Sequence, residues 1–106
     1  MKNLDKTLAA LADPTRRQVV DLLRERPRRA GELAARARTS PPAMSRHLRL
    51  LRDSGLVAAE LSDDDARVRV YRLRPDRLRT LQSWLDSFWG QQLDAFKSHA
   101  ERRPNG

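Results

Sequence analysis

The stretch TSPPAMSRHLRLLRDSG, residues 39–55, constrains the fold most strongly, because two adjacent prolines stand before a long amphipathic run. Proline is costly inside a helix, since it lacks the N–H and its ring crowds the preceding turn. At a first turn the missing N–H would have had no partner, so proline is accepted there. Thr39 or Ser40 can cap the helix, and Pro41 and Pro42 then take its first positions. The prolines therefore predict a helix that starts abruptly.

The same helix has one apolar stripe and a clear stop. Met44, Leu48 and Leu51 recur at i, i+4 and i+7, which is the spacing of one helix face. Gly55 follows with Leu56 behind it, the pattern of a helix C-terminus closed by a hydrophobic contact. The opposite face carries arginines and small polar residues, so this helix is expected to present a basic surface to solvent.

Three helices are predicted before this one. A leucine stripe favours a first helix over about residues 3–12. Asp13 then serves as N-cap and Pro14 as first residue of a second helix, which Pro27 ends. The run AGELAARA, residues 30–37, predicts a short third helix. A tight turn joins it to the proline-started helix, and such a pair forms a helix-turn-helix.

The periodicity changes from helix to strand after Gly55. Residues 56–61 and 68–73 are rich in apolar and β-branched side chains, and the polar stretch SDDDAR separates them. This pattern predicts a β-hairpin with a polar tip. Tyr71 is expected in the core, although the alternation leaves the phase of the second strand ambiguous near its end.

A last helix is predicted from Pro75 to about residue 102, with a frayed tail over residues 103–106. It carries more apolar surface than a small domain needs, so we expect one stripe to pack within the protomer and the other against a partner. Which stripe faces the partner stays open, and Trp84 is expected to serve packing as well. The two stripes consist of Leu78, Leu81, Leu85 and Phe88, and of Trp89, Leu93 and Phe96.

The charge of the chain predicts an anionic partner. A length of 106 residues suits one compact domain, and Lys and Arg number 22 against 14 Asp and Glu. Residues 24–52 hold nine arginines against two acids, and residues 67–79 hold six against one. Such concentration is expected of a binding face, and the alternative is a generally arginine-rich composition on solvated surfaces. Nucleic acid, an acidic lipid or an acidic protein would fit.

Several classes of site are excluded or unsupported. The chain has no cysteine, which removes disulfides and thiolate metal sites. Its longest apolar runs are far shorter than a membrane span, and its start lacks the apolar core of a signal peptide. We therefore expect a soluble cytoplasmic protein, with no membrane partner. No catalytic constellation or phosphate-binding glycine loop is present, so no catalytic residue and no cofactor are predicted.

The order of the predicted elements is that of a winged helix-turn-helix domain, a mainly α fold with a small β-hairpin. The domain would span residues 1–102, with the helix-turn-helix at about 30–54, the wing at about 56–73 and the last helix at about 75–102. A B-DNA major groove admits one α-helix, and the second helix of the motif enters with its N-terminal residues nearest the bases.

The prolines are then explained, because they let short side chains at the start of the helix approach base edges. Arg46 suits a bidentate guanine contact, while Arg49 and Arg52 lie further along for the DNA backbone. The predicted DNA-binding residues are Thr39, Ser40, Pro42, Ala43, Ser45, Arg46, His47 and Arg49, with Arg67 and Arg69 on the wing.

The strings LADPTRRQVVDLL, GELAARARTSPPAMSRHLRLLRDSGLV and RVYRL resemble the ArsR/SmtB-type bacterial winged-helix repressors over residues 8–73. The resemblance implies a homodimer that binds a palindromic operator, represses its own operon and is nucleoid-associated when bound. It also implies dimerisation through the first and last helices. The expected interface residues are Leu4, Leu8, Leu11, Leu81, Leu85, Phe88, Trp89, Leu93 and Phe96.

The metal sites of that family are not matched here. The run GELAARA stands where the resemblance implies a cysteine cluster, and the last helix offers only Asp86, Asp94, His99 and Glu101. Zinc needs three or four converging ligands, and Asp94 and His99 are not on one helix face. The ending WLDSFWGQQLDAFKSHAE resembles a subgroup that lacks metal sites. We predict no metal, so any inducer would be an organic effector or a protein.

Some alternatives stay open at this point. A winged-helix module whose basic face binds an acidic protein is the main rival function, while RNA binding lacks exposed aromatic residues for base stacking. His47 can contact a phosphate or brace its helix against the domain. The acidic run at residues 63–65 should repel phosphate. Either this tip is held away from DNA, with Arg67 and Arg69 contacting the DNA from the base of the wing, or the wing contributes little.

Overall fold

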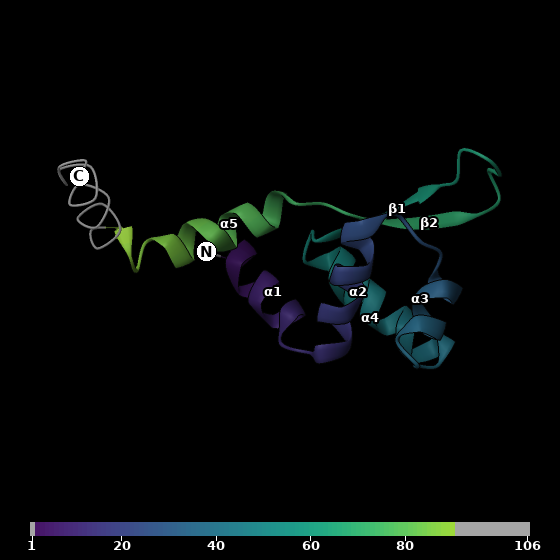
Figure 1. Ribbon diagram of the computed structural model, residues 1–106, viewed down its shortest axis with the longest axis horizontal. Helices are drawn as coiled ribbons and strands as arrows, with labels where there is room; N and C mark the ends of the chain where they lie inside the picture. Colours follow the sequence, from purple (N-terminus) through teal and green to yellow (C-terminus); the bar gives the residue numbers. More distant parts are fainter. Residues whose placement is uncertain (1, 91–106) are drawn as a thin grey trace, which may run out of the picture.

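The computed structural model describes residues 2–90 and contains five helices and one hairpin in the predicted order, which confirms a winged helix-turn-helix. Figure 1 shows helices α1–α4 gathered together, with the hairpin projecting from one end and α5 running toward the other. The elements are α1 (Lys2–Leu11), α2 (Pro14–Glu25), α3 (Ala30–Arg36), α4 (Pro41–Asp53), β1 (Val57–Leu61), β2 (Arg69–Leu73) and α5 (Asp76–Asp86).

Two helices begin at a capping side chain followed by proline, as the sequence predicts. The Asp13 carboxylate accepts a hydrogen bond from the Arg16 backbone N–H at 3.1 Å. The Ser40 hydroxyl accepts one from the Ala43 N–H at 3.2 Å, which decides between Thr39 and Ser40 as the cap of α4. Each cap satisfies an N–H that has no partner within its helix.

Stability should depend on pH through Asp13. The hydrogen bond from the Arg16 backbone N–H lowers the pKa of Asp13 below its ordinary value of 3.8. A lowered pKa in the folded state means that the carboxylate stabilises the fold above pH 3.8 and loses this contribution as the pH falls below that value. We expect Asp13→Asn, which keeps the cap acceptor, to be near neutral at pH 7 and to flatten the acid branch of the stability curve. Urea unfolding across pH 2–6 measures this, and an unchanged acid branch would contradict it.

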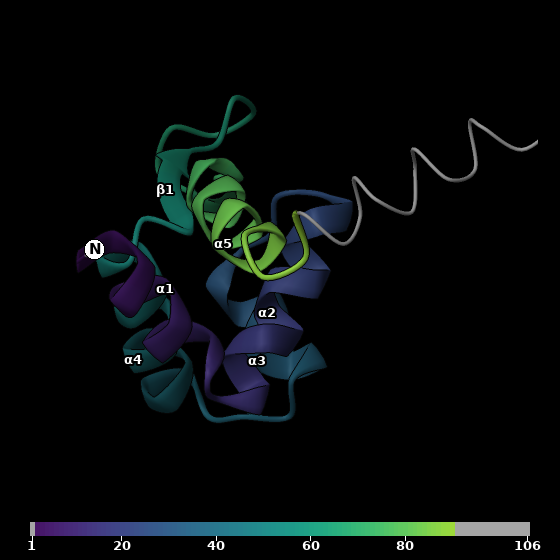
Figure 2. The ribbon, with the colours of Figure 1, turned by 90° about the vertical axis from the view of Figure 1, so that its left-hand side faces the viewer.

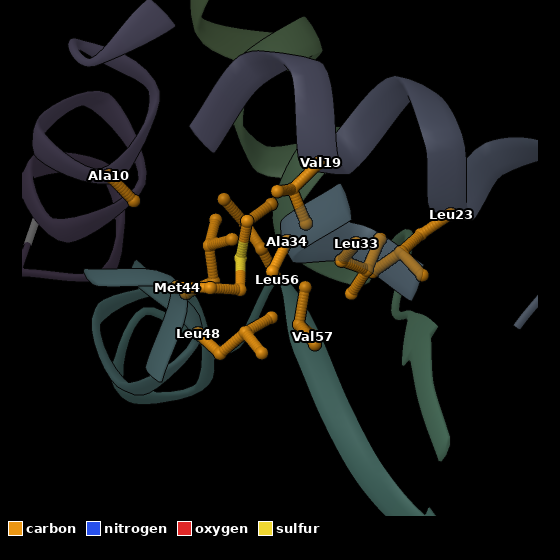
Figure 3. Packing of buried hydrophobic residues seen from close by; sticks show 10 residues of the cluster. Ala10, Val19, Leu23, Leu33, Ala34, Met44, Leu48, Leu56 and Val57 are labelled. Carbon is orange, nitrogen blue, oxygen red and sulfur yellow. The ribbon is translucent and has the colours of Figure 1, made fainter. Parts of the chain in front are cut away.

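The core lies between the four N-terminal helices and the start of the hairpin. Figure 3 shows Met44 and Leu48 of α4, Val19 of α2 and the residues that enter β1 directed toward one another. Gly55 adopts a left-handed φ of 82°, which turns the chain from α4 so that Leu56 enters this core. The buried cluster consists of Ala10, Val19, Leu23, Leu33, Ala34, Met44, Leu48, Leu51, Leu56 and Val57.

The hairpin pairs β1 and β2 in antiparallel register, from Val57 opposite Leu73 to Leu61 opposite Arg69. Tyr71 and Leu73 pack against the core, so this is the face of β2 that is directed inward. The prediction that Tyr71 belongs to the core is confirmed. A further β-bridge joins Tyr71 to Arg28 through two backbone hydrogen bonds. The Arg28 N–H donates to Tyr71 O at 3.0 Å, and the Tyr71 N–H donates to Arg28 O at 2.8 Å. The base of the wing is thereby tied to the segment between α2 and α3.

Arg28 is buried, with 3% of its surface exposed. It is one of the nine arginines of residues 24–52 from which the sequence predicts a binding face, but it does not belong to that face. Its Nε donates to Leu22 O at 3.0 Å, one Nη donates to Glu25 at 2.6 Å, and the other bonds Glu32. The hydrogen bond from Arg28, followed by one from Arg26, lowers the pKa of Glu32. A buried cation needs such partners, because burial of an unpaired charge is strongly unfavourable.

The last helix starts near Pro75 as predicted; α5 ends at Asp86, residues 87–89 form a turn, and Gly90 is helical again. The Ser87 hydroxyl donates to Trp84 O, and the N–H groups of Phe88 and Trp89 bond to carbonyls three residues back. The Ser87 hydroxyl competes for a helix carbonyl, and bonds that span three residues tighten the backbone, so together they interrupt the helix at this turn. The predicted continuation over 91–102 and the tail at 103–106 lie outside the described residues.

Candidate nucleic-acid interface

The first turns of α4 carry the predicted DNA-binding side chains on its solvent face. Buried Met44, Leu48 and Leu51 seat the opposite face in the core. The side chains aligned away from that stripe are therefore directed outward. Among the predicted contacts, Ser40, Pro42, Ser45, Arg46 and Arg49 are exposed, and Thr39, Ala43 and His47 are half-buried.

A tight turn sets α4 against α3. Arg38 adopts a left-handed φ of 54°, and the Thr39 N–H donates to Ala34 O at 3.0 Å across the turn. Leu33 and Ala34 bury the facing side of α3. This packing leaves the capped N-terminus of α4 at the surface, where the Ser40 hydroxyl and the positive end of the helix dipole can meet an anion such as a phosphate.

His47 faces into the protein rather than only outward. Its Nδ1 lies 3.2 Å from Arg16 Nη1, which supports the bracing interpretation of this residue. The Arg16 guanidinium also donates to Ala10 O at 2.7 Å and to Ala9 O at 3.2 Å, both at the C-terminal end of α1. Sequence reasoning gave Arg16 no role. The sequence feature that could have indicated this role is the position of Arg16 shortly after α1, because the last carbonyls of a helix lack partners within it.

The wing tip uses one of its three carboxylates internally. Asp65 accepts from the Arg67 backbone N–H at 3.0 Å and lies 3.4 Å from Arg67 Nε. The hydrogen bond from that N–H is the main cause that lowers the pKa of Asp65. Asp63 and Asp64 are exposed beside it. Arg67 therefore sits at the acidic tip, although the sequence predicts it at the base of the wing, whereas Arg69 lies on β2.

A polar groove of about 460 Å³ runs between the C-terminal half of α4 and the start of β1. Arg49, Arg52 and Arg74 line it together with Asp53. Sequence reasoning missed Arg74, which reaches this groove because its backbone N–H donates to Leu56 O at 2.7 Å and holds the end of β2 beside the start of β1. Three guanidinium groups around one groove suit a phosphate.

The predicted dimer residues differ in how far their side chains are exposed in one protomer. Leu4 is 3% exposed, so its surface is already covered within the protomer, and Leu11 packs against the core. Leu81 is half-buried. Leu8 and Leu85 are each 38% exposed, Trp89 46% and Phe88 60%. Helix α1 packs beside α5, as Figure 2 shows with α5 viewed nearly end-on. Leu93 and Phe96 lie outside the described residues.

The described residues do not fit the metal sites that the family resemblance implies. Over residues 2–90, no group of three or more His, Cys, Asp and Glu side chains converges on a metal position. In α3, Leu33 and Ala34 are buried apolar residues, and Glu32 is bonded to Arg26, Arg28 and Arg36. Asp94, His99 and Glu101 lie outside the described residues.

Within residues 2–90, no helix combines the length and the hydropathy that crossing a membrane would require.

Comparisons with known proteins agree with this geometry. Residues 13–59 match the family described as "Bacterial regulatory protein, arsR family". Over 92 residues the chain is 41% identical to the HTH-type transcriptional regulator Rv2034 of Mycobacterium tuberculosis, covering 87% of this chain and 83% of that protein. It is 33% identical over 55 residues to the transcriptional repressor SdpR of Bacillus subtilis, covering 52% of this chain and 61% of SdpR.

A solved structure gives the same result. The ArsR-like transcriptional regulator from Rhodococcus sp. RHA1 superimposes with a TM-score of 0.74 and 30% identity, covering 96% of this chain and 94% of that one. The family match spans α2 to β1, the segment that contains the helix-turn-helix and its exposed basic helix. The chain therefore belongs to the ArsR family of bacterial regulatory proteins and is a DNA-binding transcription regulator rather than an enzyme.

Proposed function

We propose that this regulator is a homodimeric repressor of its own operon, which binds a palindromic operator and does not respond to metals. The observation that carries the proposal is the N-terminal half of α4: it is capped by Ser40, begins with two prolines and exposes Ser45 and Arg46, with Arg49 exposed further along the helix. This half of the helix enters the major groove, since that groove accommodates one helix at a time.

The contacts divide into base readout and backbone binding. Arg46 reads guanine through two hydrogen bonds, and Ser45 and Ala43 approach neighbouring base edges. Ser40 and the helix N-terminus bind a phosphate, with Thr39 and Pro42 packed at the same entry. Arg49 and His47 bind the DNA backbone together with Arg69 on β2 of the wing, and Arg67 does so only by leaving its contact with Asp65 at the acidic tip.

A second copy of the chain covers the exposed apolar residues of α1, α5 and the turn that follows α5. Leu8, Leu85, Phe88 and Trp89 supply this surface, and the Trp84 and Phe88 rings stack edge to face with centroids 5.0 Å apart. Large exposed aromatic residues at one place are typical of protein interfaces. A two-fold dimer then places two α4 helices in successive major grooves, which requires a palindromic site.

Repression is inferred from SdpR, which is named a transcriptional repressor. Metal independence is supported by the absence of cysteine from the sequence and by the ion pairs that occupy Glu32. Any effector is then an organic molecule or a protein. Operator binding places the protein at the nucleoid.

Selection of bound sequences from a random duplex pool at moderate salt tests the proposal. We expect a two-fold motif whose half-sites lie about one helical turn, 10–10.5 base pairs, apart. Sedimentation of the protein with the recovered duplex should give two chains per duplex. Binding without sequence preference, combined with capture of a defined acidic protein, would instead assign the basic face to protein interaction.

A further inference from the structure

We propose that Arg16 is a positioning residue for operator recognition, which holds the recognition helix α4 in place against α1 through His47. The inference rests on the proposed function, because it assigns a role in reading DNA to a residue outside the reading helix. Arg16 lies on α2, yet its guanidinium bonds groups of both α1 and α4.

The guanidinium of Arg16 bonds three acceptors at once. Nε donates to Ala10 O at 2.7 Å, Nη2 to Ala9 O at 3.2 Å, and Nη1 lies 3.2 Å from His47 Nδ1. The group is planar, and its donors diverge in a rigid fork. Two bonds to α1 therefore fix the direction of the third, and with it the place of His47 relative to α1.

The contact is a hydrogen bond in one tautomer of His47. An arginine is always a donor, so Nδ1 is the acceptor in this bond. In that tautomer Nε2 carries the N–H. Arg16 thus orients His47 with one donor remaining, which suits the backbone contact proposed for it.

Small displacements of α4 matter because Arg46 is adjacent to His47 in the chain. A bidentate contact to guanine requires placement to within about 0.5 Å. Non-specific binding to phosphates tolerates larger displacements, since it depends mainly on charge. Loss of the Arg16 bond should therefore reduce discrimination between sequences more than total affinity.

Arg17 provides a matched control. It is the next residue of α2, it is exposed, and its Nη1 donates to Leu11 O at 2.7 Å, so it also satisfies a carbonyl at the end of α1. This hydrogen bond of Arg17 joins α2 to α1 and does not involve α4. The two arginines share their charge and a bond to the end of α1, whereas Arg16 is half-buried, donates to two carbonyls of α1 and also contacts His47.

The experiment compares Arg16→Lys with Arg17→Lys in the full-length protein. Lysine keeps the charge but replaces the rigid fork by a single ammonium. The Kd of each variant is measured for the selected operator and for a scrambled duplex of equal length. We expect Arg16→Lys to reduce the ratio of specific to non-specific affinity about tenfold, the effect of one charge-assisted hydrogen bond, and Arg17→Lys to leave it unchanged.

A double-variant cycle with His47→Ala distinguishes positioning through His47 from other roles. We expect Arg16→Lys to have little further effect on the ratio when His47 is already alanine, because the bond it removes is gone. Thermal unfolding verifies that each variant is folded. If Arg16→Lys does not fold, His47→Ala alone should reproduce the loss of discrimination.

The outcomes separate the two proposals. Equal ratios for the Arg16 and Arg17 variants, in a protein that binds its operator specifically, would overturn the positioning role and leave the repressor proposal intact. Additive effects of Arg16→Lys and His47→Ala would overturn it too, since the residues would then act independently. A wild-type protein without sequence preference would overturn the proposed function and the positioning role together.

Discussion

Replacing Arg46 by alanine is expected to weaken binding to the selected operator by about 1–3 kcal/mol and to relax the preference at one base pair of each half-site. Arg46 is exposed on the second turn of α4, opposite the stripe that seats the helix in the core. A guanidinium at this position can donate to both O6 and N7 of guanine, a pair that no other base offers in the major groove. Its loss should therefore act at one position of the motif rather than on the whole site.

Arg24→Ala is the matched control for the loss of one positive charge. Arg24 is exposed on α2 and forms a surface ion pair with Asp21 at 3.5 Å, and it lies outside the proposed interface. We expect the Arg24→Ala variant to select the same DNA motif as the wild-type protein, and any loss of affinity to be equal for the operator and the scrambled duplex. A uniform loss of the same kind in Arg46→Ala would show that Arg46 binds the backbone and that base readout lies elsewhere on α4.

Replacing Arg28 by alanine is expected to lower the free energy of unfolding by about 2–3 kcal/mol, below the full cost of breaking a wholly buried ion pair. The Arg28 side chain is buried, while its partners Glu25 and Glu32 reach water. The substitution leaves the Leu22 carbonyl without its donor and creates space behind the bridge to Tyr71. Solvent can still hydrate both carboxylates, which limits the loss.

Urea unfolding at neutral pH, followed by circular dichroism, measures this effect. Arg26→Ala is the control, because Arg26 pairs with the same Glu32 at 2.7 Å but from the surface. A surface ion pair contributes about 0.2–1 kcal/mol at most, so the Arg26 variant should stay close to wild type. Equal effects of the two substitutions would mean that burial of Arg28 adds nothing to its ion pairs.

Much of the architecture could be predicted because its signals are local. The caps Asp13 and Ser40, each followed by proline, mark where α2 and α4 begin, and Gly55 marks where α4 gives way to the hairpin. These residues act on backbone groups within a few positions of themselves, so their effects can be predicted from the local sequence. The outward face of α4 follows equally from the spacing of Met44, Leu48 and Leu51.

The roles of the arginines could not be predicted in this way. Arg28, Arg46 and Arg74 look alike in the sequence, yet one is buried in an ion-pair cluster, one is exposed on α4 and one lines a groove with α4. A long, flexible cation takes its role from whatever acceptors the fold brings within reach, and these are distant in sequence. Arg16 meets His47, which is 31 positions away, for this reason.

The sequence by itself determined the order of the elements, the sharp start of α4 and the basic face that it presents, because turns, caps and periodicity depend on near neighbours. Only the tertiary structure decided that Leu4 is covered within the protomer, that His47 is held by Arg16 and that the base of the wing is tied to Arg28. Each of these outcomes depends on which surfaces meet after the chain has folded. Packing brings together groups that lie far apart in the sequence, and a local sequence pattern cannot predict such contacts.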